Sequence, residues 1–278
     1  MLARFREKAV DPLAPVLTIP WGGRRVTLLT SAEAYPILMV AIVTAVFATD
    51  RYTSLHGQWL LSVPVWAALL GTLYFRPPAI RAATLGVLVI ATIGECCFSL
   101  WWQFYVYRLH NLPLFIPAGH AGLYLAALSM ADSRIARRFP LGFCGVAVAI
   151  GAVWSILGLT VLPQKDLMGY LGNLWWATFL WWGRLPQAVA GVFYMVTYIE
   201  IFGVAEGVWR WQPHAWGIDF LTLGQPPVGA TMFYVIFELG GFVIGPWIYF
   251  GGLKLLRRLG GGLGAPSGGP VRERPAEV

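Results

Sequence analysis

Eight long apolar segments dominate the chain and constrain its fold more than any other feature. They cover residues 33–49, 58–75, 82–104, 117–131, 139–162, 168–182, 187–207 and 228–250. A helix needs about 20 predominantly apolar residues to cross the hydrocarbon core of a bilayer. We therefore predict an all-α fold, a polytopic integral membrane bundle with about eight transmembrane helices. The fourth and sixth segments are short for a span, and merging or dropping the sixth gives a bundle of seven.

The composition agrees with a membrane protein and excludes several other classes. Apolar residues make up 58% of the chain and charged residues only 12%, whereas soluble chains are roughly 45–50% apolar and about 25% charged. These values exclude a disordered chain, a coiled coil and an ordinary soluble enzyme. No lysine lies in the middle of an apolar segment, which excludes a retinal Schiff base, and no P-loop, G-x-S-x-G or H-E-x-x-H motif is present.

The distribution of basic residues predicts the orientation. If the N-terminus is cytoplasmic, only four of the 20 Lys and Arg residues fall in outer segments, namely Arg51, Arg108, Lys165 and Arg210. Cytoplasmic loops carry an excess of Lys and Arg, so we predict that both termini are cytoplasmic. The same bias explains the net charge of +7 without nucleic acid as a partner. We divide the chain into a cytoplasmic segment (1–32), a transmembrane domain (33–256) and a disordered cytoplasmic tail (257–278).

Two outer segments have an unusual composition. Pro113 and Pro117 should give a fixed, extended entry into the fourth span, because proline disfavours helix in the residues before it. The loop from 206 to 227 is the longest outer loop, and both segments are predicted to cover a pocket. Tryptophans fall near the predicted outer interface, where indole rings prefer to lie, and we interpret most of them as anchors: Trp59, Trp101, Trp102, Trp209, Trp211 and Trp216.

Three glutamates lie inside predicted spans, where a charge costs at least about 2.5–3.5 kcal/mol. They are Glu95, Glu200 and Glu238, and His120 joins them near the outer end of the fourth span. With a rise of about 1.5 Å per residue, the glutamates lie about 10–15 Å below the outer ends of their helices and His120 about 5 Å below. All four should therefore lie in the outer half of the bilayer, and we predict that they are catalytic.

Neighbours at helical spacing complete the predicted pocket. A hydroxyl or an indole three, four or seven residues from an acidic residue or His120 shares its helix face. Arg210 lies between two tryptophans and is a candidate for binding an anionic head group. The predicted substrate-binding residues are Ser99, Trp102, Tyr124, Thr197, Arg210 and Tyr234.

The chemistry of these residues leaves three classes of function open. Burial favours the protonated form of a carboxyl group, which suits general-acid chemistry on an apolar substrate. The same glutamates would suit a proton-coupled transporter or permease, or the interhelical hydrogen bonds of a non-catalytic accessory subunit. No Glu-x-x-His or His-x-x-x-His spacing is present, so no cofactor is predicted. If a divalent metal binds, its ligands would be Glu95, His120, Glu200 and Glu238.

A resemblance to other membrane proteins favours the first of these three classes, an enzyme that performs acid–base chemistry. The run from Leu112 to His120, followed by Glu200, the Trp209-x-Trp211 pattern, Pro226-Pro227 and Glu238, resembles a group of uncharacterised bacterial polytopic membrane proteins. More distantly, the chain resembles the carotenoid-biosynthesis membrane proteins that hydrate terminal isoprenoid double bonds, and small polytopic terpene cyclases that use intramembrane carboxyls.

The resemblance implies a multi-pass enzyme of the bacterial plasma (inner) membrane. It would act as a lyase or hydratase, or as an isomerase or cyclase, on an isoprenoid- or carotenoid-like molecule. Its partners would be membrane lipids and this apolar small-molecule substrate.

Overall fold

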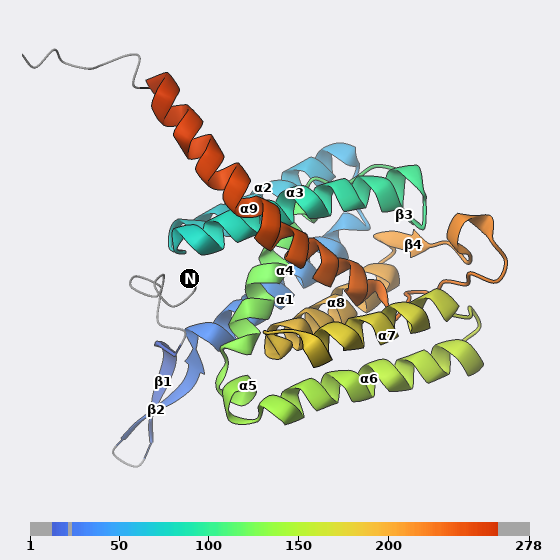
Figure 1. Cartoon of the computed structure of the whole chain (residues 1–278), viewed down its shortest axis with the longest axis horizontal. Helices are drawn as coiled ribbons and strands as arrows, with labels where there is room; N and C mark the ends of the chain where they lie inside the picture. The colour runs from blue at the N-terminus through green and yellow to red at the C-terminus, as the bar shows by residue number, and fades with distance from the viewer. Residues whose placement is uncertain (1–12, 22–23, 261–278) are drawn as a thin grey trace, which may run out of the picture.

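The computed structural model describes residues 13–21 and 24–260, and within them the chain is mostly helical (Figure 1). Nine α-helices and four short strands make up this part of the chain. The helices are α1 (Ser31–Asp50), α2 (Leu55–Tyr74), α3 (Pro78–Glu95), α4 (Phe115–Ala131), α5 (Arg134–Arg138), α6 (Pro140–Thr160), α7 (Leu167–Trp182), α8 (Pro186–Ala205) and α9 (Ala230–Gly260).

Eight of these helices coincide with the eight predicted apolar segments, and only the five-residue α5 has no counterpart among them. Five helical stretches are long and apolar enough to cross a membrane: Ser31–Asp50, Pro78–Trp101, Pro140–Thr160, Pro186–Ala205 and Ala230–Leu255. The prediction of a mostly helical chain with several helices of membrane-spanning character is therefore confirmed.

Proline and polar caps set the ends of these helices. Pro78, Pro140 and Pro186 occupy the first positions of α3, α6 and α8, where the missing N–H is not needed and the fixed φ suits a helix. Ser54 caps α2 and Asp166 caps α7, each accepting a hydrogen bond from a backbone N–H three residues on. These signals set where α2, α3, α6, α7 and α8 begin.

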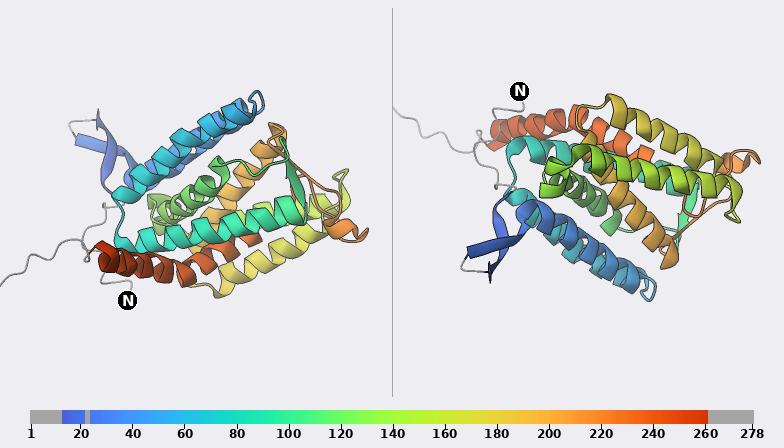
Figure 2. Two further views of the ribbon diagram at one scale, coloured as in Figure 1. Left: turned by 90° about the horizontal axis from the view of Figure 1, so that it is seen from above. Right: turned by 90° about the horizontal axis from the view of Figure 1, so that it is seen from below.

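Two small antiparallel ribbons lie at opposite ends of the bundle (Figure 2). At one end β1 (Pro15–Trp21) pairs with β2 (Arg24–Thr30). At the other end β3 (Tyr105–Tyr107) pairs with β4 (Trp209–Trp211). The all-α prediction overlooked both ribbons. The strands of the second are three residues long, too short for a periodic pattern in the sequence.

Helix α4 forms the centre of the bundle. It packs against α1, α2, α3 and α8, and most of its residues are buried. The segment before it, from Arg108 to Leu114, is irregular backbone. Helix α4 itself has 17 residues. Pro117 lies within its first turn, so the prediction of an extended chain up to Pro117 is wrong, and only Pro113 lies outside the helix.

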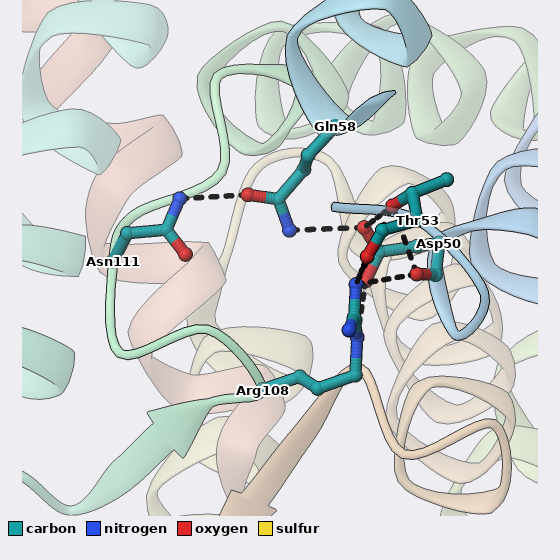
Figure 3. A network of polar contacts seen from close by, with 5 residues as sticks. All are labelled: Asp50, Thr53, Gln58, Arg108 and Asn111. Carbon is teal, nitrogen blue, oxygen red and sulfur yellow. Dashed lines mark hydrogen bonds and ion pairs between the residues drawn. The ribbon is translucent and has the colours of Figure 1, made fainter. Parts of the chain in front are cut away.

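A polar network joins the α1–α2 connection to the segment before α4 (Figure 3). The fully buried Asp50 carboxylate accepts from Gln58 Nε2 at 2.9 Å and lies 3.5 Å from Arg108 Nε. Arg108 also donates to the backbone oxygens of Asp50 and Thr53, at 2.5 and 2.8 Å. Asn111 donates to Gln58 Oε1 at 2.7 Å. These bonds position the chain that carries β3.

Asp166 fastens the long outer loop to the start of α7. Its buried carboxylate accepts hydrogen bonds from the backbone N–H groups of Gly169, Gly224 and Val228, at 2.8–2.9 Å. Burial raises the pKa of Asp166 above its ordinary value, although the three N–H donors oppose this shift. Asp166 thus joins the loop between β4 and α9 to α7, and bonds from Gln164 to Leu223 and from Leu167 to Thr222 add to this attachment.

The structure describes only part of the two predicted terminal segments, 1–32 and 257–278. Residues 15–21 and 24–30 of the predicted N-terminal segment form the paired strands β1 and β2, and α9 continues through Gly260, beyond the predicted start of the tail at 257. The two termini and the rest of the tail lie outside the described residues.

Candidate functional site

A cavity lies between α1, α4 and α8 under the β3–β4 ribbon. The space between its lining residues, including the part that is open to the surroundings, is about 690 Å³. Most of its wall is aliphatic or aromatic. Its polar wall consists of Glu95, Tyr105, Tyr107, His120, Glu200 and Tyr234.

Glu95 lies at the end of α3 and is surrounded by donors. Its Oε2 accepts hydrogen bonds from the hydroxyls of Tyr105 and Tyr107, both at 2.7 Å, and its Oε1 lies 2.7 Å from Nε2 of His120. A π-helical turn, Cys96–Trp101, follows directly. Such turns widen the backbone and occur frequently at functional sites. Here the turn lets the chain leave α3 and return as β3 over the carboxyl.

The two tyrosines of β3 are held as hydrogen-bond donors. Burial, and then the nearby Glu95 carboxyl, raise the pKa of both hydroxyls well above the ordinary value. They therefore stay protonated throughout the physiological range. Val106 lies between them on the strand, so Tyr105 and Tyr107 point to the same face, which is the face toward the bundle.

Glu200 on α8 has a different environment. Its Oε2 accepts from two indole N–H groups of β4, Trp209 Nε1 at 3.1 Å and Trp211 Nε1 at 3.0 Å. The Trp209 ring lies against Gly203, where an added Cβ would collide with the ring. A small residue one turn beyond the glutamate thus makes room for the indole that binds it.

Aromatic rings join the two carboxyls. Tyr234 of α9 lies near both Glu95 and Glu200 and stacks on His120, with ring centroids 4.6 Å apart. Phe47 of α1 meets Trp209 edge to face at 5.2 Å. The carboxyl groups are therefore enclosed by aromatic faces rather than by other charges.

A second cavity lies on the other side of the carboxyl pair. It holds about 310 Å³ of empty space, and Glu95, Tyr105, Glu200 and Tyr234 line both it and the first cavity. The remaining wall is apolar and includes Phe98, Phe233 and Phe237. The two glutamates thus lie between two hydrophobic compartments.

Of the predicted catalytic residues, the structure brings Glu95, His120 and Glu200 together but places Glu238 elsewhere. Glu238 lines neither cavity, and its buried Oε1 has no hydrogen-bond partner among the residues that the structure describes. Tyr124 lies near it, and its buried hydroxyl has no partner within the same part of the chain. Both residues lie one helical turn beyond the cluster, since Tyr124 follows His120 and Glu238 follows Tyr234 by four positions.

Among the predicted substrate-binding residues, Tyr234 alone lines these two cavities. Ser99 donates to the backbone oxygen of Glu95, and Thr197 lies outside both linings. Trp102 is partly exposed and packs against Phe98, Phe104 and Trp216. Arg210 points away from the bundle because it alternates with the inward-facing Trp209 and Trp211.

The sequence interpretation missed the four donors of the ribbon. Trp209 and Trp211 are buried and bind Glu200, so their interpretation as interfacial anchors is wrong. Tyr105 and Tyr107 were not among the predicted site residues. The signal that would have found all four is the aromatic-x-aromatic pattern in two outer segments, which places each pair on one face of a strand.

The carboxyl and imidazole groups of this site do not form a metal site among the described residues. Within 13–21 and 24–260, His, Cys, Asp and Glu side chains do not gather in groups of three or more with suitable geometry. The possible ligand set Glu95, His120, Glu200 and Glu238 is therefore not assembled as a cluster there.

Comparisons with models of protein families, with curated proteins and with solved structures gave no match.

Proposed function

We propose that the protein is an integral membrane enzyme that performs acid–base chemistry on a lipid-soluble, isoprenoid- or carotenoid-like substrate. The observation that carries this proposal is the pair of carboxyls in one apolar cavity, each held by a different set of donors. Two carboxyls in different environments are the usual basis for one acid and one base in the same site.

Glu200 is the acid. An indole N–H donates and cannot accept, so the oxygen that receives Trp209 and Trp211 carries no proton. When Glu200 is neutral, its proton therefore resides on Oε1. This arrangement supports protonation of a double bond at the carbon nearest Oε1, which leaves a carbocation on the substrate and a carboxylate on Glu200.

Glu95 and His120 form the base. Two tyrosine hydroxyls donate to Glu95 Oε2, and Oε1 lies 2.7 Å from His120 Nε2, so a proton that Glu95 accepts can pass to the imidazole. The pair accepts a proton from the carbon next to the cation, which forms a new double bond and gives an isomer or a cyclised product. If water adds to the cation instead, the pair accepts the proton that the water loses, and the product is an alcohol.

The aromatic walls support the cationic intermediate. The π faces of Phe47, Trp209 and Tyr234 line or adjoin the cavity, and aromatic faces attract cations. An accessory subunit would need only the hydrogen bonds, whereas the cavities beside both carboxyls favour a bound substrate.

The proposed setting is the plasma membrane of a bacterium, with eight crossings and cytoplasmic termini. Arg108 follows β3 and Arg210 lies in β4, Arg51 pairs with Glu206 just before β4, and Lys165 follows Gln164, which bonds to the loop after β4. The two ribbons lie at opposite ends of the bundle (Figure 2). This distribution supports an orientation with the β3–β4 ribbon outside, in which the carboxyl pair would lie in the outer half of the bilayer.

The proposal is tested by mass spectrometry of lipid extracts from a host that expresses the wild type, Glu200→Gln, Glu95→Gln or Glu238→Gln. We expect the wild type to convert a host isoprenoid to an isomer, a cyclised product or a hydrated product. Glu200→Gln and Glu95→Gln should reduce this conversion by about 100-fold or more, while Glu238→Gln retains it. An unchanged lipid profile between the wild type and both cavity variants contradicts the proposal.

A further inference from the structure

A third cavity lies between α7, α9 and the loop that precedes α9. It holds about 620 Å³ of empty space, and its lining contains no titratable side chain. Its side-chain wall includes Met168, Leu171, Trp175 and Met232. The lining side chains carry no charge, and their only hydrogen-bonding groups are the indole N–H groups of Trp175 and Trp211, so an apolar group gains most by binding there.

The third cavity adjoins the second. Phe104, Trp211, Ala230 and Phe233 line both of them, while Glu95 and Glu200 line the second and the first. The three compartments therefore follow one another, with the carboxyl pair between the first two. A compact ligand would occupy one compartment, whereas a linear chain can occupy the series.

The third cavity reaches the outer surface of α7. Leu171 and Trp175, which lie one turn apart on that helix, are 48% and 52% exposed. If the bundle lies in a bilayer, this surface meets the acyl chains, so an apolar molecule reaches the cavity without crossing water.

We propose that the third cavity binds the distal part of a linear isoprenoid or polyene chain whose reactive double bond lies between Glu95 and Glu200. This inference rests on the proposed function and adds the shape of the substrate to it. The compartments lie in a series, and the wall farthest from the carboxyls is wholly apolar. Together these features favour a long unbranched hydrocarbon over a polar-headed or compact molecule.

Photo-crosslinking of the full chain in lipid nanodiscs tests the site independently of catalysis. The probe is a linear C20 prenyl alcohol with a diazirine on its terminal isoprene unit, and adducts are located by peptide mass spectrometry. The variants are Met232→Trp, which fills the cavity, and Leu171→Trp, which blocks its mouth and keeps a half-exposed position. Leu174→Trp is the control, because Leu174 is 49% exposed on the same helix but does not line the cavity.

We expect wild-type adducts on the α7 and α9 peptides that line the third cavity, and at least a fivefold loss of them in Met232→Trp and Leu171→Trp but not in Leu174→Trp. Adducts that lie only on α1 and α4 and do not change in the variants would overturn this inference and leave the proposed function standing. Adducts in none of the three cavities would overturn the inference and count against the proposed function as well. If Met232→Trp fails to fold, the test rests on the comparison of adduct yields between Leu171→Trp and Leu174→Trp.

Discussion

At the scale of single residues, the two carboxyls of the cavity differ in their donors. Glu95 receives two phenolic hydroxyls and an imidazole nitrogen, and Glu200 receives two indoles. Hydroxyls and imidazole can pass a proton, whereas an indole only donates a hydrogen bond. This difference separates a base that exchanges protons with its neighbours from an acid whose proton is directed into the cavity.

The tyrosine pair should behave as a unit. Tyr105→Phe or Tyr107→Phe alone leaves one hydroxyl on Glu95 Oε2, while the double variant leaves none, so the loss of stability in the double variant should exceed the sum of the single losses. We expect each single change to cost about 0.5–1.5 kcal/mol and the coupling to be about 0.5–3 kcal/mol. The measurement is a double-mutant cycle on urea unfolding of the purified protein in mixed micelles. Additive losses would show that the two hydroxyls act independently.

Trp211→Phe should destabilise the protein although it keeps an aromatic ring. It removes one of the two donors to the buried Glu200 oxygen, and a loss of this kind costs about 1–3 kcal/mol. Trp102→Phe is the control, since Trp102 is partly exposed and lies outside the cavities. The comparison uses thermal unfolding in detergent, and equal midpoints for the two variants would contradict the assigned role of the indole.

The sequence predicted Glu95, His120, Glu200 and Tyr234 because a polar residue in an apolar helix is costly and helical spacing is regular. It did not predict their partners on β3 and β4. Each partner lies only 9–12 residues from its glutamate, but its position depends on the pairing of two three-residue strands that are about 100 residues apart in the chain. Glu238 carries the same signal as the other glutamates, and only the packing of α9, which lies against α3, α7 and α8, separates it from them.

At the scale of elements, the Asp50–Arg108 network fixes the segment that leads from β3 to α4 (Figure 3). Arg108→Lys should lower stability by about 1–3 kcal/mol, because a lysine cannot bond two carbonyls and a carboxylate in the geometry of the guanidinium group. Arg51→Gln is the control, since it breaks only the exposed pair with Glu206 and should leave the unfolding midpoint unchanged. An Arg108→Lys midpoint equal to that of Arg51→Gln would show that the network does not hold this segment.

Asp166→Asn should test the fastening of the outer loop. Asparagine has one acceptor oxygen and cannot satisfy all three backbone N–H groups, so we expect a loss of about 1–3 kcal/mol at pH 4. Burial raises the pKa of Asp166 in the folded state, so its stabilising contribution is complete below the ordinary pKa and falls as the pH rises through the folded value. The difference in stability between the wild type and the Asp166→Asn variant should narrow between pH 4 and pH 7 in thermal unfolding. A difference that widens with pH would contradict this account.

The helices could be predicted from the sequence and the ribbons could not. Apolar segments bounded by Pro78, Pro140 and Pro186 carry the signal of a helix on their own. The π-helical turn after Glu95 and the β3–β4 pairing arise from tertiary contacts, which a local pattern does not contain. These unpredicted elements are the ones that build the site.

At the scale of the whole molecule, the segregation of basic residues predicts how the bundle lies in the membrane. In a variant without its native cysteines, Tyr52→Cys should react with a membrane-impermeant maleimide in intact cells, since Tyr52 is exposed beside α1 at the β3–β4 end. Ile135→Cys, exposed on α5 at the opposite end, should react only after permeabilisation. Labelling of Ile135→Cys but not Tyr52→Cys in intact cells would show that the bundle has the opposite orientation. Equal labelling of the two variants in intact cells would contradict a bundle that spans the membrane.

The most direct test of the central claim is the transfer of solvent hydrogen to carbon. Membranes containing the wild type or Glu200→Gln are incubated in D₂O with an isoprenoid extract of the host, and the lipids are analysed by mass spectrometry. The account predicts that an isoprenoid product gains carbon-bound deuterium with the wild type and that this gain falls about 100-fold or more with Glu200→Gln. Equal deuterium content of every isoprenoid in the two samples would contradict acid–base chemistry at this site.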